Sequence, residues 1–147
     1  MSWICEKCGG MTERTLEEIA SGPALVARFN QLCPAAAKNG PDVLAAAAAG
    51  NSDSLEVLRS AGEALGATVG FLVNVLDPEA VIVGGGLGLS AGVYWETFTA
   101  SARRHIWSDI HRGLPILRAS TGQAAGIVGA AAAWKKRRDR RLEVSQS

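Results

Sequence analysis

One stretch of the sequence decides the fold: NVLDPEAVIVGGG, residues 74–86. Asp77 and Pro78 predict the end of a helix, because a proline disfavours helical geometry at the residue before it. Residues 80–83 are apolar and mostly β-branched, which predicts a strand buried on both faces. Glycines follow at once, and glycine lets the backbone turn sharply and approach a ligand closely. The stretch therefore predicts a helix, a buried strand and a ligand-approach turn in direct succession.

Four of the five residues at positions 84–88 are glycine. A tight turn without a ligand needs one or two, so the run favours contact with a ligand, and the simple turn is the alternative. Residues 86–91 also match a relaxed dinucleotide-binding pattern. That pattern expects an acidic residue about 20 positions further on, where Ile106 and Trp107 stand instead. A dinucleotide-binding module is therefore the weaker interpretation.

The longest predicted helix precedes this stretch and ends at residue 76, with Ser52 or Asp53 as its cap. Its apolar residues recur at spacings of three and four, which is typical of a helix with one buried face. Gly62, Gly66 and Gly70 lie four residues apart. Because glycine weakens a helix, this row predicts that another backbone packs closely against it.

Shorter helices are predicted nearer the N-terminus, over residues 16–20 with Thr15 as the cap, over 24–32 and over 42–49. Downstream of the glycines, a further helix opens near Ser90. Its inward-facing residues are predicted to be Trp95, Phe98 and Ala102. A second strand follows over residues 114–119, and the order of helices and strands indicates an α/β layer structure.

The last predicted helix, residues 124–134, is rich in alanine, and Gly126 and Gly129 predict that it packs tightly on a sheet. The charge changes abruptly after it. Residues 1–134 carry 9 basic and 12 acidic side chains, whereas residues 135–141 carry 6 basic and 1 acidic. The simplest interpretation is a solvated helix end that complements the helix dipole, and attraction to phosphates or a membrane surface is the alternative.

The 147 residues fit one domain, and 48% of them are hydrophobic, which is enough for a core. The longest weakly polar stretch, residues 64–76, falls short of the roughly 20 apolar residues that a membrane span requires. Three cysteines are too few for a disulfide framework, and the N-terminus lacks a signal-peptide layout. We therefore expect one folded unit in a reducing cytoplasm, without a membrane partner.

Four stretches are similar, in the same order, to segments of the ROK family, whose name stands for repressor, open reading frame and kinase. They are LEEIASGPA at 16–24, residues 48–58 together with ALG at 64–66, the stretch at 74–86, and GQAAGIVGAA at 122–131. The resemblance implies an α/β fold of the actin-like ATPase (ribonuclease H-like) type, of which this chain is the C-terminal lobe, helix-rich with few strands. It also implies a cysteine-containing leader at 1–15, the lobe at 16–134 and a basic tail at 135–147.

The resemblance further implies a sugar kinase of the glucokinase kind, which phosphorylates a hexose with ATP and Mg²⁺. In that family the triple glycine lies against the adenosine part of ATP, so Gly84, Gly85 and Gly86 are the implied nucleotide contacts. Glu17 is the implied sugar contact, and a carboxylate accepts charge-assisted hydrogen bonds from neighbouring hydroxyls. The residues alone indicate only a first-turn helix position for Glu17, favoured by the helix dipole.

The sequence also departs from the family. ROK kinases carry an Asp-Gly-Gly phosphate loop and an Asn-Asp pair whose aspartate activates the sugar hydroxyl, and neither occurs here. No catalytic residue is therefore assigned, and we expect the chain alone to be catalytically incomplete. The family's zinc site has one histidine and three cysteines; only Cys5 and Cys8 are present near its place, and Thr15 stands where a cysteine would precede Leu16. Zinc bound by these two thiols is kept as a prediction from a degenerate motif.

The expected partners are a nucleotide, a sugar and a second copy of the chain, because the absence of a lobe exposes apolar surface that must be covered. The alternative function is a non-catalytic oligomeric module or a fragment of a ROK transcriptional repressor. Those repressors use an N-terminal helix-turn-helix, and nothing before Leu16 can form one. Binding to nucleic acid is therefore not expected.

Overall fold

The computed structural model describes the backbone of residues 2–4, 11–34 and 36–144. Its helices are α1 (Leu16–Ala20), α2 (Gly22–Leu32), α3 (Gly40–Ala48), α4 (Ser52–Leu76), α5 (Gly85–Gly88), α6 (Val93–His105), α7 (Asp109–Arg112) and α8 (Ala125–Val144), with a 3-10 turn, η1 (Gly122–Ala124). Strands β1 (Ser2–Ile4) and β2 (Met11–Glu13) pair antiparallel, and β3 (Val81–Val83) and β4 (Ile116–Arg118) pair parallel. The fold is helix-rich with few strands, as predicted. The β1–β2 pair was not predicted.

Helix α1 begins where the sequence predicts it. The Thr15 hydroxyl accepts a hydrogen bond from the backbone N–H of Glu18 at 3.3 Å, and the Glu18 carboxylate accepts one from the backbone N–H of Thr15 at 2.7 Å. The backbone N–H and the hydroxyl of Thr15 both donate to the Glu18 carboxylate, and they hold its pKa below the ordinary value because they stabilise the ionised form. The capping box therefore fixes the start of the helix that carries Glu17.

Helix α4 has a different cap from the one predicted. The side chain of Asn51, and not Ser52 or Asp53, accepts the backbone N–H of Ser54 at 2.9 Å. An asparagine just outside the helix reaches the third N–H, which residues already inside the helix cannot do. The other end is as predicted, because α4 stops before Asp77, which adopts a left-handed conformation with φ 48°.

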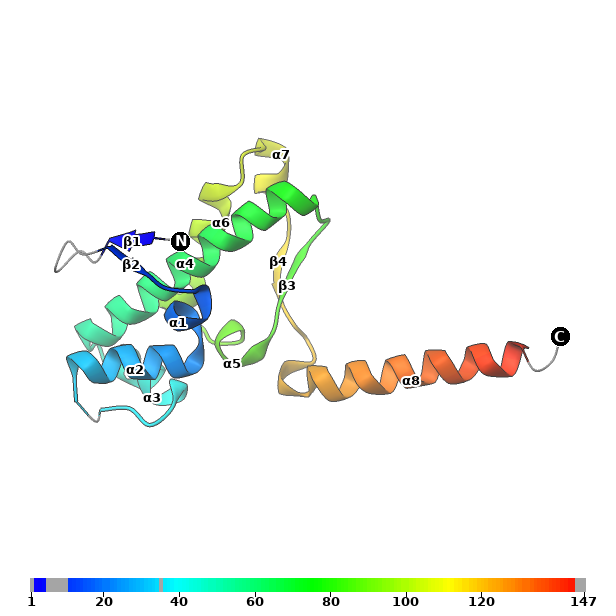
Figure 1. Cartoon of the computed structure of the whole chain (residues 1–147), viewed down its shortest axis with the longest axis horizontal. Coiled ribbons are helices and arrows are strands. Elements are labelled where there is room, and N and C mark those ends of the chain that lie inside the picture. Colours follow the sequence, from blue (N-terminus) through cyan, green and yellow to red (C-terminus); the bar gives the residue numbers. More distant parts are fainter. Residues whose placement is uncertain (1, 5–10, 35, 145–147) are drawn as a thin grey trace.

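Helices α4 and α6 pack against each other at the centre of the molecule (Figure 1). The predicted role of the glycine row is confirmed, since α6 lies directly on it. An added Cβ would lie 2.7 Å from the Tyr94 carbonyl oxygen at Gly62, 2.5 Å from that of Phe98 at Gly66, and 2.7 Å from that of Ala102 at Gly70. Separations this short leave no room for a side chain between the two backbones.

The residues of α6 that face α4 differ in part from the prediction. Phe98 and Ala102 are fully buried, as predicted, but Tyr94 and Ser101 are buried as well, and Trp95 is only half-buried. Positions 94, 98 and 102 follow the four-residue spacing that matches the glycine row, whereas Trp95 lies about 100° further around the helix. Burial raises the pKa of Tyr94 above its ordinary value, because the phenolate loses solvation.

The parallel sheet is covered on one face only, so the prediction of a strand buried on both faces was wrong for this chain. Val81 packs against a buried cluster of Val73, Ile106 and Leu114. Ile82 and its registered partner Leu117 face the other way and are 70% and 51% exposed. In the part of the chain that the structure describes, nothing covers that second face.

Helix α8 forms as predicted but does not pack on the sheet. It projects from the body of the molecule (Figure 1), and its side chains from Ala125 to Arg138 are exposed. Nothing lies within 4 Å of a Cβ added at Gly126 or Gly129. The tight packing predicted for these glycines was therefore wrong within this chain, because no described element reaches them. The helix continues through the basic residues to Val144.

Among the residues that the structure describes, no helix has the length and apolar character of a membrane span.

Candidate functional site

The glycine run directly follows the carboxyl end of β3. We expected an irregular turn and then a helix from Ser90, but residues Gly85–Gly88 form the one-turn helix α5, and the next helix, α6, begins only at Val93. Gly85 has φ 81°, a conformation that side chains disfavour, which lets the chain leave the strand and coil at once. The expected loop is thus a short helical turn that directly follows β3.

The first three glycines are exposed, and the fourth is not. A Cβ at Gly85 or Gly86 would have nothing within 4 Å, and one at Gly84 would only touch the Cβ of Ala119 at 3.7 Å. At Gly88 an added Cβ would lie 2.7 Å from the Val83 side chain, so this glycine packs α5 down on its strand. The run therefore has a fixed inner side and an open outer side.

The segment after β4 lies beside the glycine run. The backbone N–H of Ala119 donates to the carbonyl of Val83 at 2.9 Å, which extends the parallel pairing, and η1 contacts α5. In parallel sheets, ligands bind outside the carboxyl ends of the strands, where the following loops meet. Residues 119–124 were not assigned a role from the sequence. The available sequence signal was a glycine, Gly122, shortly after the second predicted strand. In the structure this glycine has φ 55°.

Glu17 lies in the first turn of α1, and its side chain is exposed. Within the described residues, no hydrogen bond or ion pair joins it to Gly84, Gly85 or Gly86, which follow a different element. Arg28 of α2 holds α1 in place, because its guanidinium donates to the Ile19 carbonyl at 2.8 Å and to the Ser60 hydroxyl at 2.5 Å. Burial lowers the pKa of Arg28, and the residue links α1, α2 and α4.

The metal prediction concerns Cys5 and Cys8, which lie outside the described residues. In the described ranges, no three histidine, cysteine, aspartate or glutamate side chains are grouped as a metal site would need. His105 Nδ1 lies 2.8 Å from the Ser101 carbonyl, and His111 Nε2 lies 2.9 Å from Asp77 Oδ1. Both histidines thus have partners of their own.

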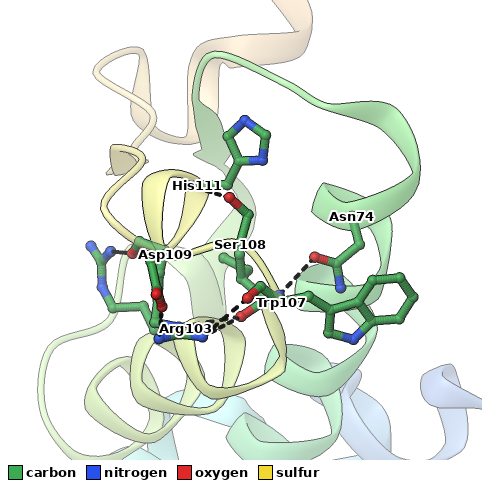
Figure 2. Close-up of polar contacts among 8 residues, drawn as sticks. Asn74, Arg103, Trp107, Ser108, Asp109 and His111 are labelled. Carbon is green, nitrogen blue, oxygen red and sulfur yellow. Dashed lines mark hydrogen bonds and ion pairs between the residues drawn. The ribbon is translucent and has the colours of Figure 1, made fainter.

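Asn74, within the stretch at 74–86, holds the ends of α4 and α6 together. Its side-chain amide donates to the His105 carbonyl at 2.8 Å. Its oxygen accepts the Trp107 N–H at 3.0 Å, as Figure 2 shows. These two bonds join the last turn of α4 to the end of α6. Asn74 thereby fixes the point at which the chain leaves α6 for β4.

Two arginines stabilise the corner between α6 and β4. Arg103 Nη1 donates to the Arg112 carbonyl, and Arg112 donates to the carbonyls of Ile106 and Trp107 at 3.2 and 3.3 Å. Asp109 pairs with Arg112, and Figure 2 labels Arg103, Trp107 and Asp109 at this corner. Asp42, Asp53, Asp77 and Asp109 all lie at helix ends. Asp109 and Asp77 are largely exposed, so neither is placed as a buried catalytic base.

A family model supplies the identification, since the model of the ROK family matches residues 3–137. This chain belongs to the ROK family. Two solved ROK kinases have similar folds. The Streptomyces griseus glucokinase, in complex with glucose and AMPPNP, has a TM-score of 0.70 at 28% identity over 86% of this chain and 46% of that one. The Thermus thermophilus hexokinase has a TM-score of 0.71 at 30% identity, over 85% and 43%.

Curated relatives include the bifunctional enzyme NanE/NanK of Brucella melitensis, which is 36% identical over 90 residues, or 60% of this chain and 16% of that enzyme. The chain thus spans under half of the solved kinases and about a sixth of this relative. A ROK family transcriptional regulator, a homologue of the E. coli MLC protein, matches with a TM-score of 0.60 at 24% identity. That likeness shows the fold alone, so it does not favour a repressor over a kinase.

Proposed function

We propose that this chain is the nucleotide-binding, C-terminal lobe of a ROK-type sugar kinase, with Gly84, Gly85 and Gly86 against the adenosine part of ATP. The observation that carries the proposal is the open glycine run at the carboxyl ends of β3 and β4, beside residues 119–124. Glycines expose backbone to a flat ring, and the absence of Cβ atoms leaves space for it. The glucokinase with a similar fold is one that binds AMPPNP.

We further propose that Glu17 accepts hydrogen bonds from sugar hydroxyls when the site is complete. Its carboxylate is exposed on α1, and the Thr15 capping box and Arg28 hold that helix in place. Catalysis needs a carboxylate within hydrogen-bond reach of the attacking hydroxyl, and the described aspartates occupy helix ends. The chain alone is therefore proposed to bind nucleotide without transferring phosphate, and Mg²⁺ would act with the complete kinase.

We also propose that a second protein surface covers the bare apolar faces, either a second copy of this chain or the remaining part of a ROK kinase. The exposed sheet face bears Ile82 and Leu117, and α8 bears Ile127 and Trp134. Apolar surface of this kind is typical of an interface. Light scattering during size exclusion would give a mass above 15.3 kDa if copies of the chain associate, and a monomeric mass would leave the kinase remainder as the partner.

Calorimetric titration of the purified chain with AMPPNP, and separately with glucose, tests nucleotide binding. The blocking variant is Gly86→Trp, because a side chain there points into open space and the backbone is not strained, unlike Gly85 with φ 81°. Gly40→Trp, at an equally open position at the start of α3, is the matched control. We expect the wild type and the control to bind AMPPNP and Gly86→Trp to lose at least about tenfold in affinity. Equal binding by all three proteins, or none by the folded wild type, would overturn the proposal.

A further inference from the structure

The glycine run is held at its exit by an arginine from β4. Arg118 is the last residue of this strand, and its guanidinium lies 4.2 Å from the centre of the Trp95 ring. Its Nη2 donates to the Ser90 carbonyl at 3.0 Å. One side chain thus joins the second strand, the first turns of α6 and the segment that leaves α5.

Each end of this link is fixed to the rest of the molecule. The Trp95 ring packs against Phe98 with centroids 5.5 Å apart, and Phe98 is fully buried under α4. Ser90 closes α5, because its hydroxyl donates to the Leu87 carbonyl at 2.6 Å and its N–H donates to the same oxygen at 3.1 Å. The Arg118 contact therefore connects the buried core to the end of the glycine helix.

The location makes this contact relevant to the glycines. The inner side of α5 is fixed at Gly88 by Val83, whereas a Cβ at Gly85 or Gly86 would have nothing within 4 Å. Val83 is also the registered strand partner of Arg118. Without the arginine, the segment from Leu89 to Gly92 would keep only its local turn bonds, since its link to β4 would be gone. A guanidinium is suited to this role, because its planar group stacks on an aromatic ring while its N–H groups remain free to donate.

We infer that Arg118 is a positioning residue for the nucleotide site: it holds the glycine run in the arrangement that receives the nucleotide, without touching the nucleotide itself. The inference rests on the proposed function. If removing the arginine lowers the population of the competent arrangement to about a fifth, the apparent affinity falls about fivefold. Lysine keeps the charge over Trp95 but lacks the fork that reaches Ser90 at the same time, so Arg118→Lys should restore part of the loss.

The test combines AMPPNP titration with amide hydrogen exchange on the full chain and on Arg118→Ala, Arg118→Lys and Arg104→Ala. Arg104 is an exposed arginine of α6, and its side chain makes no hydrogen bond or ion pair with the described residues. Its replacement therefore controls for the loss of one positive charge. We expect Arg118→Ala to bind AMPPNP about fivefold more weakly with an unchanged melting temperature, and the control to bind as wild type. The N–H groups of Leu89 and Ser90, bonded to Gly85 and Leu87, should exchange faster in Arg118→Ala and return to wild-type rates at saturating AMPPNP.

Unchanged affinity or unchanged exchange at Leu89 and Ser90 in Arg118→Ala would overturn the positioning role. A melting temperature that falls in step with affinity would overturn it too, because Arg118 would then be a general stabiliser. If the wild type binds no AMPPNP, the proposed function fails. The exchange rates then decide separately whether Arg118 fixes the glycine run.

Discussion

The two longest helices carry the same sequence signature and have opposite environments. Both α4 and α8 are apolar over much of their length and contain spaced glycines. In α4 the glycines lie against the α6 backbone, where an added Cβ would approach to 2.5–2.8 Å, whereas nothing lies within 4 Å of those in α8. Glycines in an apolar helix therefore indicate a close partner without saying which polypeptide provides it. For α4 this partner is α6, and for α8 none of the described residues provides one.

The largest expected difference between α4 and α8 is in how much the unfolding free energy falls when an aromatic side chain is removed. Phe98→Ala removes a fully buried ring between α6 and α4 and should lower the free energy of unfolding by about 3–5 kcal/mol. Trp134→Ala removes an exposed ring of α8 and should change it by less than about 0.5 kcal/mol. Urea unfolding monitored by circular dichroism gives both values. A cost for Trp134→Ala near that of Phe98→Ala would mean that α8 is covered in solution.

Replacing a glycine by alanine should destabilise α4 and stabilise α8. Gly66→Ala places a Cβ 2.5 Å from the Phe98 carbonyl oxygen, so it should cost about 1–3 kcal/mol of unfolding free energy despite the better helix propensity of alanine. Gly129→Ala meets no atom, and alanine should instead favour α8 by up to about 1 kcal/mol, visible as increased helical ellipticity. Destabilisation by Gly129→Ala would show that a partner backbone lies against α8.

Removing the Asn74 side chain at the end of α4 should have an intermediate effect on the unfolding free energy. Asn74→Ala removes both hydrogen bonds that hold the end of α6, and it should lower the unfolding free energy by roughly 1–2 kcal/mol. Glu96→Gln, an exposed α6 position, serves as a control and should stay within about 0.5 kcal/mol of wild type. Equal stability of the two variants would contradict the role given to Asn74.

The smallest expected effect is a change in thiol reactivity at the start of α4. The hydrogen bond from Cys33 to Asp53, at 3.4 Å, raises the pKa of the thiol, with smaller contributions from burial and the carboxylate charge. Asp53→Asn should lower this pKa and so increase the thiolate fraction near pH 8, which speeds alkylation by roughly a few fold. Mass spectrometry of iodoacetamide-treated protein, with Cys5 and Cys8 replaced by serine, measures the rate. The difference should disappear at pH values above both pKa values, and a slower rate in the variant would contradict the assigned cause.

Most local signals in the sequence were reliable. The exception is the cap of α4, which is Asn51 in place of Ser52 or Asp53. The Thr15 cap, the stop at Asp77 and Pro78, and the packing role of Gly62, Gly66 and Gly70 were all predicted correctly. Each depends on neighbouring residues or on a spacing within one helix. The ROK resemblance came from four such stretches in order, and the family model bears it out.

The errors arose where the environment depends on distant parts of a fold. An apolar strand predicts burial on both faces, but Ile82 is exposed because no described residue packs on its face of the sheet. The same holds for Gly126 and Gly129. The helical turn at Gly85 and the neighbouring segment 119–124 were missed because only the parallel pairing of β3 and β4 brings them together. Glu17 and the glycines as ligand contacts, and zinc at Cys5 and Cys8, stay predictions.

Photocrosslinking with 8-azido-ATP followed by peptide mass spectrometry tests the central claim most directly, because it reports where the adenine lies. We predict adducts in residues 84–92 or 119–124, competed by unlabelled ATP. The basic residues of α8, Lys135, Lys136 and Arg137, offer the triphosphate a purely electrostatic alternative. Adducts confined to α8 and abolished by moderate salt would contradict a nucleotide site at the carboxyl ends of β3 and β4.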